Sequence, residues 1–209
     1  MKSAYIDISW PITNDMTAYK DRNIVRIAPT KEFAQDKARE SLITLGSHTG
    51  THIDAPAHFI EHGTTVEQIF FTHLIGNCRV IDISTCHDKI SVHDLGKHNV
   101  QAHEIILLKT SNSAHAVTAN FEPNFIYLSA DAANFLAQKK IKTVGIDYLG
   151  IERNQPRHET HQKLLSAGIV IIEGLRLGHV EAGSYKFICL PLLLPGLDAA
   201  PARAVLQQN

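Results

Sequence analysis

Residues 125–146 have the sequence FIYLSADAANFLAQKKIKTVGI, in which a helical segment lies between two short apolar runs. The runs Phe125–Leu128 and Val144–Ile146 are rich in β-branched and aromatic residues, which favour strands. Ser129 is one of the residue types that cap a helix N-terminus, and we expect a helix from there through about Lys140. The segment therefore predicts a strand, a helix and a second strand in succession.

The same pattern extends to both sides of this segment. A second helix is expected from Glu159 or Thr160 to Ala167, where Gly168 would stop it, and a short helix is expected to start at Ser91. Further strands are predicted for apolar runs bounded by Gly, Pro, Asn or Asp, namely Tyr5–Ile8, Ser41–Leu45, Arg79–Ile83, Ile105–Leu108, Ile169–Ile172 and Lys186–Leu190. Helices thus interrupt the strands in the second half, while the first half is mostly strand and loop. This order predicts an α/β fold with a central mixed sheet.

Length and charge limit the architecture and the partners. A chain of 209 residues predicts a single domain over residues 1–209. Twenty Lys and Arg stand against 21 Asp and Glu, and no basic cluster stands out. Nucleic acids and anionic membranes are bound by clustered basic residues, so neither is an expected partner.

Cysteine usage and hydropathy predict a cytoplasmic protein. The start of the chain, MKSAYIDISWPI, lacks the apolar core of a signal peptide. The most apolar stretch, Phe187–Leu197, is interrupted by Pro191 and Pro195 and is too short to span a bilayer. The three cysteines, Cys78, Cys86 and Cys189, lie far apart and form no CxxC pair, which is typical of reduced thiols.

Residues 47–59, SHTGTHIDAPAHF, carry the densest group of metal-ligating side chains. His48, His52, Asp54 and His58 follow the spacing H-x3-H-x-D-x3-H. Nitrogen and oxygen ligands of this kind suit a divalent ion such as Zn²⁺ or Mn²⁺. Three protein ligands would leave a position open for water, which is typical of catalytic rather than structural sites.

The backbone of this segment has to bend if His48 and His52 share one ion. On a straight strand the two residues would lie roughly 13 Å apart. A helix would bring them together, but Gly50 and Pro56 both disfavour one. We therefore expect an irregular turn or bulge. His58 follows the ligands closely, and its spacing permits either a general acid–base role or a role as a fourth ligand.

A second cluster lies downstream, in residues 157–161 and at Glu173. Glu173 ends an apolar run, where a buried carboxylate would need a cation or a donor. The alternative is an exposed glutamate at a sheet edge. His158 and His161 are both candidate ligands, and their spacing alone does not separate them.

Four segments together resemble the cyclase family of metal-dependent hydrolases, which includes bacterial kynurenine formamidase and isatin hydrolase. HTGTHIDAPAHF, at residues 48–59, is similar to the family signature. Similar later segments are VGIDYLGIE at residues 144–152, THQKLLSAGIVIIEGL at 160–175 and VEAGSYKFICLPLLLPGLDAAPARAVL at 180–206. The resemblance covers nearly the whole chain. It implies the family's swivelling β/β/α-type domain, and homodimers or homotetramers with the site near a subunit contact.

The resemblance also implies a site with two divalent ions, Zn²⁺ first and Mn²⁺ second. His48, His52 and Asp54 match the ligands of one ion. Asp54 matches a carboxylate that bridges to the second ion, whose other ligands His161 and Glu173 match. His58 matches the acid–base histidine.

The activity that the resemblance implies is hydrolysis of a small amide, with N-formylkynurenine cleaved to kynurenine and formate. Opening of isatin, or of another lactam or lactone, is the alternative, and an inactive metal-binding protein is a third. Residues 16–22, MTAYKDR, lack the Pro-Gly turn of the formamidases, and Tyr19 is the candidate replacement for their substrate-contacting aromatic residue. Tyr148 and Leu149 stand where formamidases carry Thr and Pro. The ligands match the family better than the substrate-contacting segments do.

Overall fold

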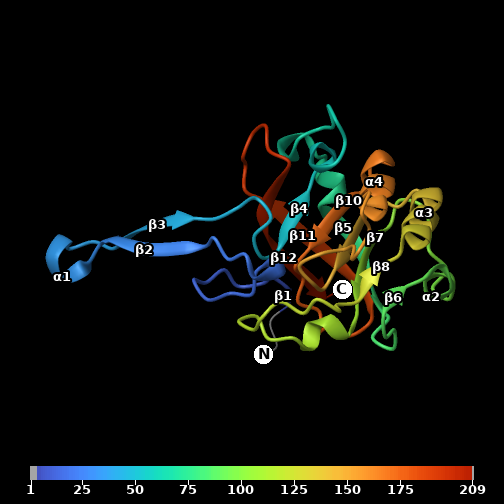
Figure 1. Ribbon diagram of the computed structural model, residues 1–209, viewed down its shortest axis with the longest axis horizontal. Coiled ribbons are helices and arrows are strands. Elements are labelled where there is room, and N and C mark those ends of the chain that lie inside the picture. Colours follow the sequence, from blue (N-terminus) through green and yellow to red (C-terminus); the bar gives the residue numbers. More distant parts are fainter. Residues whose placement is uncertain (1–3, 209) are drawn as a thin grey trace.

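A sheet that closes on itself forms the centre of the molecule (Figure 1), in a computed structural model that describes residues 4–208. Its eight strands follow the order β1, β12, β11, β5, β7, β9, β10, β4, and a further pairing of β12 with β4 closes the ring. The strands are β1 (Tyr5–Asp7), β4 (His52–Asp54), β5 (Ile75–Asp82), β7 (Ile105–Lys109), β9 (Thr143–Ile146), β10 (Val170–Glu173), β11 (Gly183–Pro191) and β12 (Ala199–Gln208). β1 pairs with β12 outside the ring.

Parallel and antiparallel pairings divide the ring. Neighbours among β5, β7, β9 and β10 run parallel, and the other pairings are antiparallel. Parallel neighbours need crossover connections, and helices α3 (Ala130–Lys139) and α4 (Glu159–Ser166) supply two of them. Both lie on the same side of the ring as α2 (Val92–Gly96) in Figure 1. The expected α/β class with a central mixed sheet is therefore confirmed.

Alternating side chains of the strands build two hydrophobic cores. In β7, Ile106 and Leu108 belong to a core shared with Leu136 of α3, whereas Leu107 belongs to a second core with Phe187 of β11. This alternation follows from the two-residue period of a strand. No helix within residues 4–208 is long and apolar enough to cross a membrane.

Most predicted elements coincide with observed ones, and their ends follow the expected capping chemistry. The Ser129 hydroxyl accepts a hydrogen bond from the Ala132 N–H at the start of α3. Ser91 caps α2 in a reciprocal arrangement with Asp94. Gly168 follows α4 with a φ of +72°, the left-handed conformation of a helix stop. Four strands were not predicted: β2 (Arg26–Lys31), β4, β12 and the short β6 (Lys89–Ile90), which pairs with β8 (Tyr127–Leu128).

The expectation of an irregular segment over residues 47–59 is wrong in its middle part. His52–Asp54 forms β4, which is buried and pairs with both β10 and β12. Hydrogen bonding on two sides holds these residues extended, which the local sequence does not reveal. The turn is confined to the preceding residues, where Gly50 has a φ of +61°, and a 3-10 turn at Pro56–His58 follows.

A two-stranded arm projects from the ring (Figure 1). It consists of β2, β3 (Glu40–Thr44) and, at the tip, the short helix α1 (Phe33–Asp36). Phe33, Leu42 and Ile43 are each more than half exposed on it. An isolated hairpin is marginally stable in water. This arm also exposes apolar side chains to solvent.

Gly174 lets the loop around Gly50 lie close to the end of β10. It has a φ of +70°, and a Cβ there would lie 2.2 Å from the Gly50 carbonyl oxygen. Gly174→Ala is expected to lower the free energy of unfolding by about 3 kcal/mol, because clash and left-handed strain add. Gly168→Ala is the matched control, with a φ of +72° and open space, and should lose only about 1 kcal/mol. Equal losses in urea unfolding would contradict the clash.

Candidate metal centre

The ligand candidates from the first half of the chain lie on and around β4. His52 and Asp54 are the ends of β4, His48 lies in the turn before it, and His58 ends the 3-10 turn after it. The second half contributes from two neighbouring elements. Glu173 ends β10, where it stands opposite His52 in the strand pairing, and His161 lies in the first turn of α4.

Asp54 is at the centre of this group, and its two oxygens face different partners. Its Oδ1 lies 2.9 Å from His48 Nδ1 and 3.5 Å from His52 Nε2. Its Oδ2 lies 3.6 Å from His161 Nε2. Glu173 faces the same two sides, with Oε2 at 3.4 Å from His52 Nε2 and Oε1 at 3.3 Å from His161 Nε2.

Burial of these charged side chains is energetically unfavourable unless a cation is bound among them. Asp54 is fully buried and Glu173 is 5% exposed. Both Asp54 oxygens and His52 Nε2 are buried without a hydrogen-bond partner. Buried carboxylates without donors are strongly destabilising. The orphaned atoms point at one another, and the donor set of imidazole nitrogens and carboxylate oxygens fits divalent metal ions.

The pKa values of the two carboxyl groups also indicate that both are negatively charged and are stabilised by neighbouring positive charge. Burial alone would raise the pKa of Asp54, but the neighbouring imidazoles of His161 and His48 outweigh burial and hold this pKa well below its usual range. Burial and the Asp54 charge would also raise the pKa of Glu173, yet His161 and His52 lower it to about 2. Both carboxylates are therefore ionised at neutral pH.

Each candidate ligand histidine is oriented through its other ring nitrogen. His48 Nε2 lies 2.8 Å from Asp198 Oδ2, and His161 Nδ1 lies 3.0 Å from Glu152 Oε2. His52 Nδ1 contacts the Gly50 carbonyl oxygen at 2.9 Å. Such contacts fix the ring and the tautomer of metal-ligating histidines. They leave one nitrogen of each ring directed at the Asp54–Glu173 pair.

Asp198 and Glu152 were not identified as candidate site residues from the sequence. Asp198 precedes Ala199, which pairs with Asp54, so the closure of the ring brings it to His48. Glu152 also accepts a hydrogen bond from the His161 N–H. Each of these two acidic residues follows or ends an apolar run in a segment that resembles the family. This position is the sequence feature that could have identified them as candidates.

Between the two downstream histidines, the structure places His161 against Asp54 and Glu173. His158 instead forms a short hydrogen bond to Glu152 and is half exposed. It occupies the left-handed N-cap position of α4, with a φ of 53°. His158 therefore lies beside the centre, where it contacts Glu152.

His58 faces the same centre from its open side. Its ring lies 4.1 Å from the ring of His48, and its Nδ1 lies 3.4 Å from Asp198 Oδ2. Burial is the main cause that lowers the pKa of His58, so the imidazole is neutral at pH 7. A neutral imidazole at this position can accept a proton.

The centre opens into a pocket of about 300 Å³. Besides the metal-ligating group, its walls include the aromatic residues Tyr19 and Phe59 and the aliphatic Leu149. Tyr19, the candidate substrate-contacting residue, thus lines the pocket that contains His58 and Glu173. The arrangement combines a site for cations, a neutral base and a partly apolar pocket, which suits hydrolysis of a small molecule.

Comparison with known proteins shows the family of this chain. A profile of the cyclase family matches residues 6–153. A kynurenine formamidase of Bacillus cytotoxicus is 33% identical over 208 residues, covering 98% of each chain. A solved potential metal-dependent hydrolase with cyclase activity superposes with a TM-score of 0.89 at 42% identity, covering 98% of both chains. An isatin hydrolase bound to thioisatinate shares the fold, with a TM-score of 0.85 at 22% identity over 98% of this chain and 92% of the other. The chain belongs to the cyclase family.

Proposed function

We propose that this protein is a metal-dependent amidohydrolase of the arylformamidase type, which cleaves N-formylkynurenine to kynurenine and formate. The observation that carries the proposal is the buried Asp54–Glu173 pair facing three imidazole nitrogens, with neutral His58 at its open side. Relatives that match over the full length of the chain are kynurenine formamidases.

In this proposal the protein holds two divalent ions. His48, His52 and Asp54 would hold one, and His161 and Glu173 would hold the other together with Asp54. Zn²⁺ suits this mixture of imidazole and carboxylate best, and Mn²⁺ also fits. When bound, such ions lower the pKa of water and polarise a carbonyl group.

The protein's own groups perform the proton transfers. His58 accepts the proton that water loses as its oxygen attacks the formyl carbon, and returns a proton to the aryl nitrogen as the C–N bond breaks. Asp198, 3.4 Å from His58 Nδ1, holds the ring and leaves Nε2 for these transfers. Phe59 and Leu149 line the pocket and limit the access of bulk water.

We also propose that residues 1–209 act as one domain in a homodimer or homotetramer. Pairing of β1 with β12 joins the two ends of the described chain in one sheet, which supports the single domain. The exposed apolar residues of the arm support the oligomer, because contact with another subunit would cover them. Cys78, Cys86 and Cys189 are free, in keeping with a reducing compartment such as the cytoplasm.

Release of formate from N-formylkynurenine tests the activity. Purified protein is expected to produce formate and kynurenine in equal amounts, and a chelator should abolish the reaction. Isatin ring opening without formate release from N-formylkynurenine would replace the proposal with lactam hydrolysis, an activity of a protein that shares this fold. Bound metal without turnover of either compound would favour the inactive metal-binding protein.

A further inference from the structure

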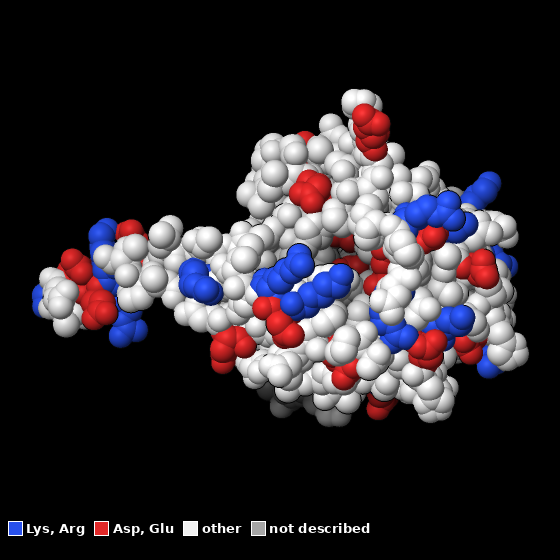
Figure 2. Space-filling model, in the orientation of Figure 1, with Lys and Arg blue, Asp and Glu red and all other residues white. Residues whose placement is uncertain are grey.

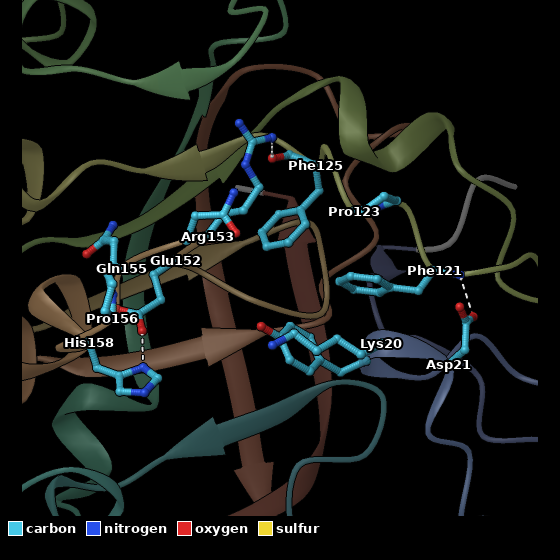
Figure 3. A pocket seen from close by; sticks show the side chains of 12 residues that line it. Lys20, Asp21, Phe121, Pro123, Phe125, Glu152, Arg153, Gln155, Pro156 and His158 are labelled. Atoms are coloured by element: carbon cyan, nitrogen blue, oxygen red, sulfur yellow. Dashed lines mark hydrogen bonds and ion pairs between the residues drawn. The ribbon is translucent and has the colours of Figure 1, made fainter.

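A second cavity, of about 700 Å³, adjoins the pocket of the metal centre. The two share Tyr19, Glu152 and His158 in their walls. Phe121 and Phe125 form the apolar part of the larger cavity, shown in Figure 3. The space is large enough for the part of a substrate that extends away from the scissile bond.

Tyr19 connects the two spaces. It lines the pocket of the metal centre together with Glu152 and Glu173. Burial is the main cause that raises the pKa of its phenol, and the charges of these two carboxylates raise this pKa further. The Tyr19 ring packs edge-on against Phe121 at 5.0 Å, and Phe121 packs against Phe125 at 5.7 Å. An aromatic surface therefore runs from the metal centre into the larger cavity.

Four charged side chains line the larger cavity, and three of them have protein partners. Arg153 pairs with Asp88 and donates a hydrogen bond to the Phe125 carbonyl oxygen. Glu152 is hydrogen-bonded to His158 and contacts His161. Asp21 accepts a hydrogen bond from the Phe121 N–H at 2.7 Å and turns toward that backbone in Figure 3.

Lys20 is the fourth charge. Within residues 4–208 its ammonium group makes no hydrogen bond or ion pair with the protein, and it lies over the Tyr19 ring, 5.1 Å from the ring centre. Lys20 has a φ of 52°, a conformation that is rare for residues other than glycine and that clusters at ligand sites. The one charge of the cavity without such a partner is thus positive, and it lies over Tyr19, a residue that lines both pockets.

The charge pattern of the surface agrees with this assignment. Figure 2 shows basic side chains gathered along the edge of a hollow whose interior exposes acidic ones. An anionic substrate would meet the basic edge first.

We propose that Lys20 is a specificity-determining residue, which binds the carboxylate of an aryl amide whose ring lies along Tyr19 and Phe121. The inference rests on the proposed function and adds the residue that recognises the carboxylate of that substrate and so favours it over a neutral amide. The ammonium group can donate up to three hydrogen bonds to such a carboxylate. A neutral lactam has no carboxylate and would gain no binding energy from the Lys20 ammonium group.

Binding of the product tests Lys20 independently of turnover. In calorimetry, Lys20→Gln in the metal-loaded protein is expected to weaken the binding of kynurenine about tenfold. Binding of kynurenine methyl ester, which lacks the carboxylate charge, should stay unchanged. Lys20→Arg should restore most of the affinity for kynurenine. Lys139→Gln is the matched control, because Lys139 also lies over an aromatic ring, Phe135, but does not line the cavity.

Two results would overturn the assignment. One is equal weakening of acid and ester by Lys20→Gln, which would indicate a general effect on the cavity. The other is unchanged binding of the acid. The proposed function is tested separately by formate release, so a wild-type protein that binds kynurenine through Lys20 but releases no formate would contradict the activity and support the binding site.

Discussion

Asp54→Asn is expected to remove most of the bound metal and to lower kcat/KM for N-formylkynurenine roughly a thousandfold, about 4 kcal/mol of transition-state stabilisation. Asp54 directs Oδ1 toward His48 and His52 and Oδ2 toward His161, so a single amide in its place offers one acceptor oxygen instead of two. Metal content by plasma mass spectrometry and initial rates of formate release measure the two effects.

Asp131→Asn is the matched control for this variant, because Asp131 is exposed in the first turn of α3. It should retain both metal and rate. Asp54→Asn is also expected to keep its circular dichroism spectrum, since strand pairing holds β4 on both sides. Full metal content in Asp54→Asn would show that Asp54 is not shared between two ions.

His58→Gln is expected to lower kcat about 10²- to 10⁴-fold, because the substitution removes the acid–base group. The metal content should stay the same, because the substitution removes no metal ligand. The pKa of His58 is lowered mainly by burial, so the wild-type imidazole is neutral and ready to accept a proton. Rates under saturating substrate, paired with metal analysis of the same sample, separate chemistry from metal binding.

His62→Gln provides the control for His58, since His62 is four residues away and its side chain is 92% exposed. Loss of metal from His58→Gln would make His58 a fourth ligand, an alternative that its closeness to His48 and Asp54 allows. Full turnover with full metal content would leave His58 without a part in the reaction.

Elements with local signals were predictable from the sequence. The helix after Ser129 carries its own cap, and most of the apolar runs became strands of the ring. The spacing of His48, His52, Asp54 and His58 predicted one part of the candidate metal centre, because these residues are close in sequence as well as in space. The resemblance to a family supplied His161 and Glu173, which residue spacing alone left open.

Features that depend on long-range pairing were not predictable in the same way. β4 is extended because β10 and β12 flank it, and nothing in the residues 47–59 encodes those partners. The same pairing brings Asp198 to His48 across a sequence separation of 150 residues. The strand β2 lies in the projecting arm and contains Pro29 and charged residues. These residue types are uncommon in strands, so the sequence did not predict one there.

Formate release during metal titration tests whether two ions on this site carry out amide hydrolysis. Protein stripped with a chelator is expected to release no formate from N-formylkynurenine. Addition of Zn²⁺ or Mn²⁺ should restore the rate and reach a plateau at two ions per chain. Full activity of the stripped protein, or no formate release at any metal content, would contradict the proposed mechanism.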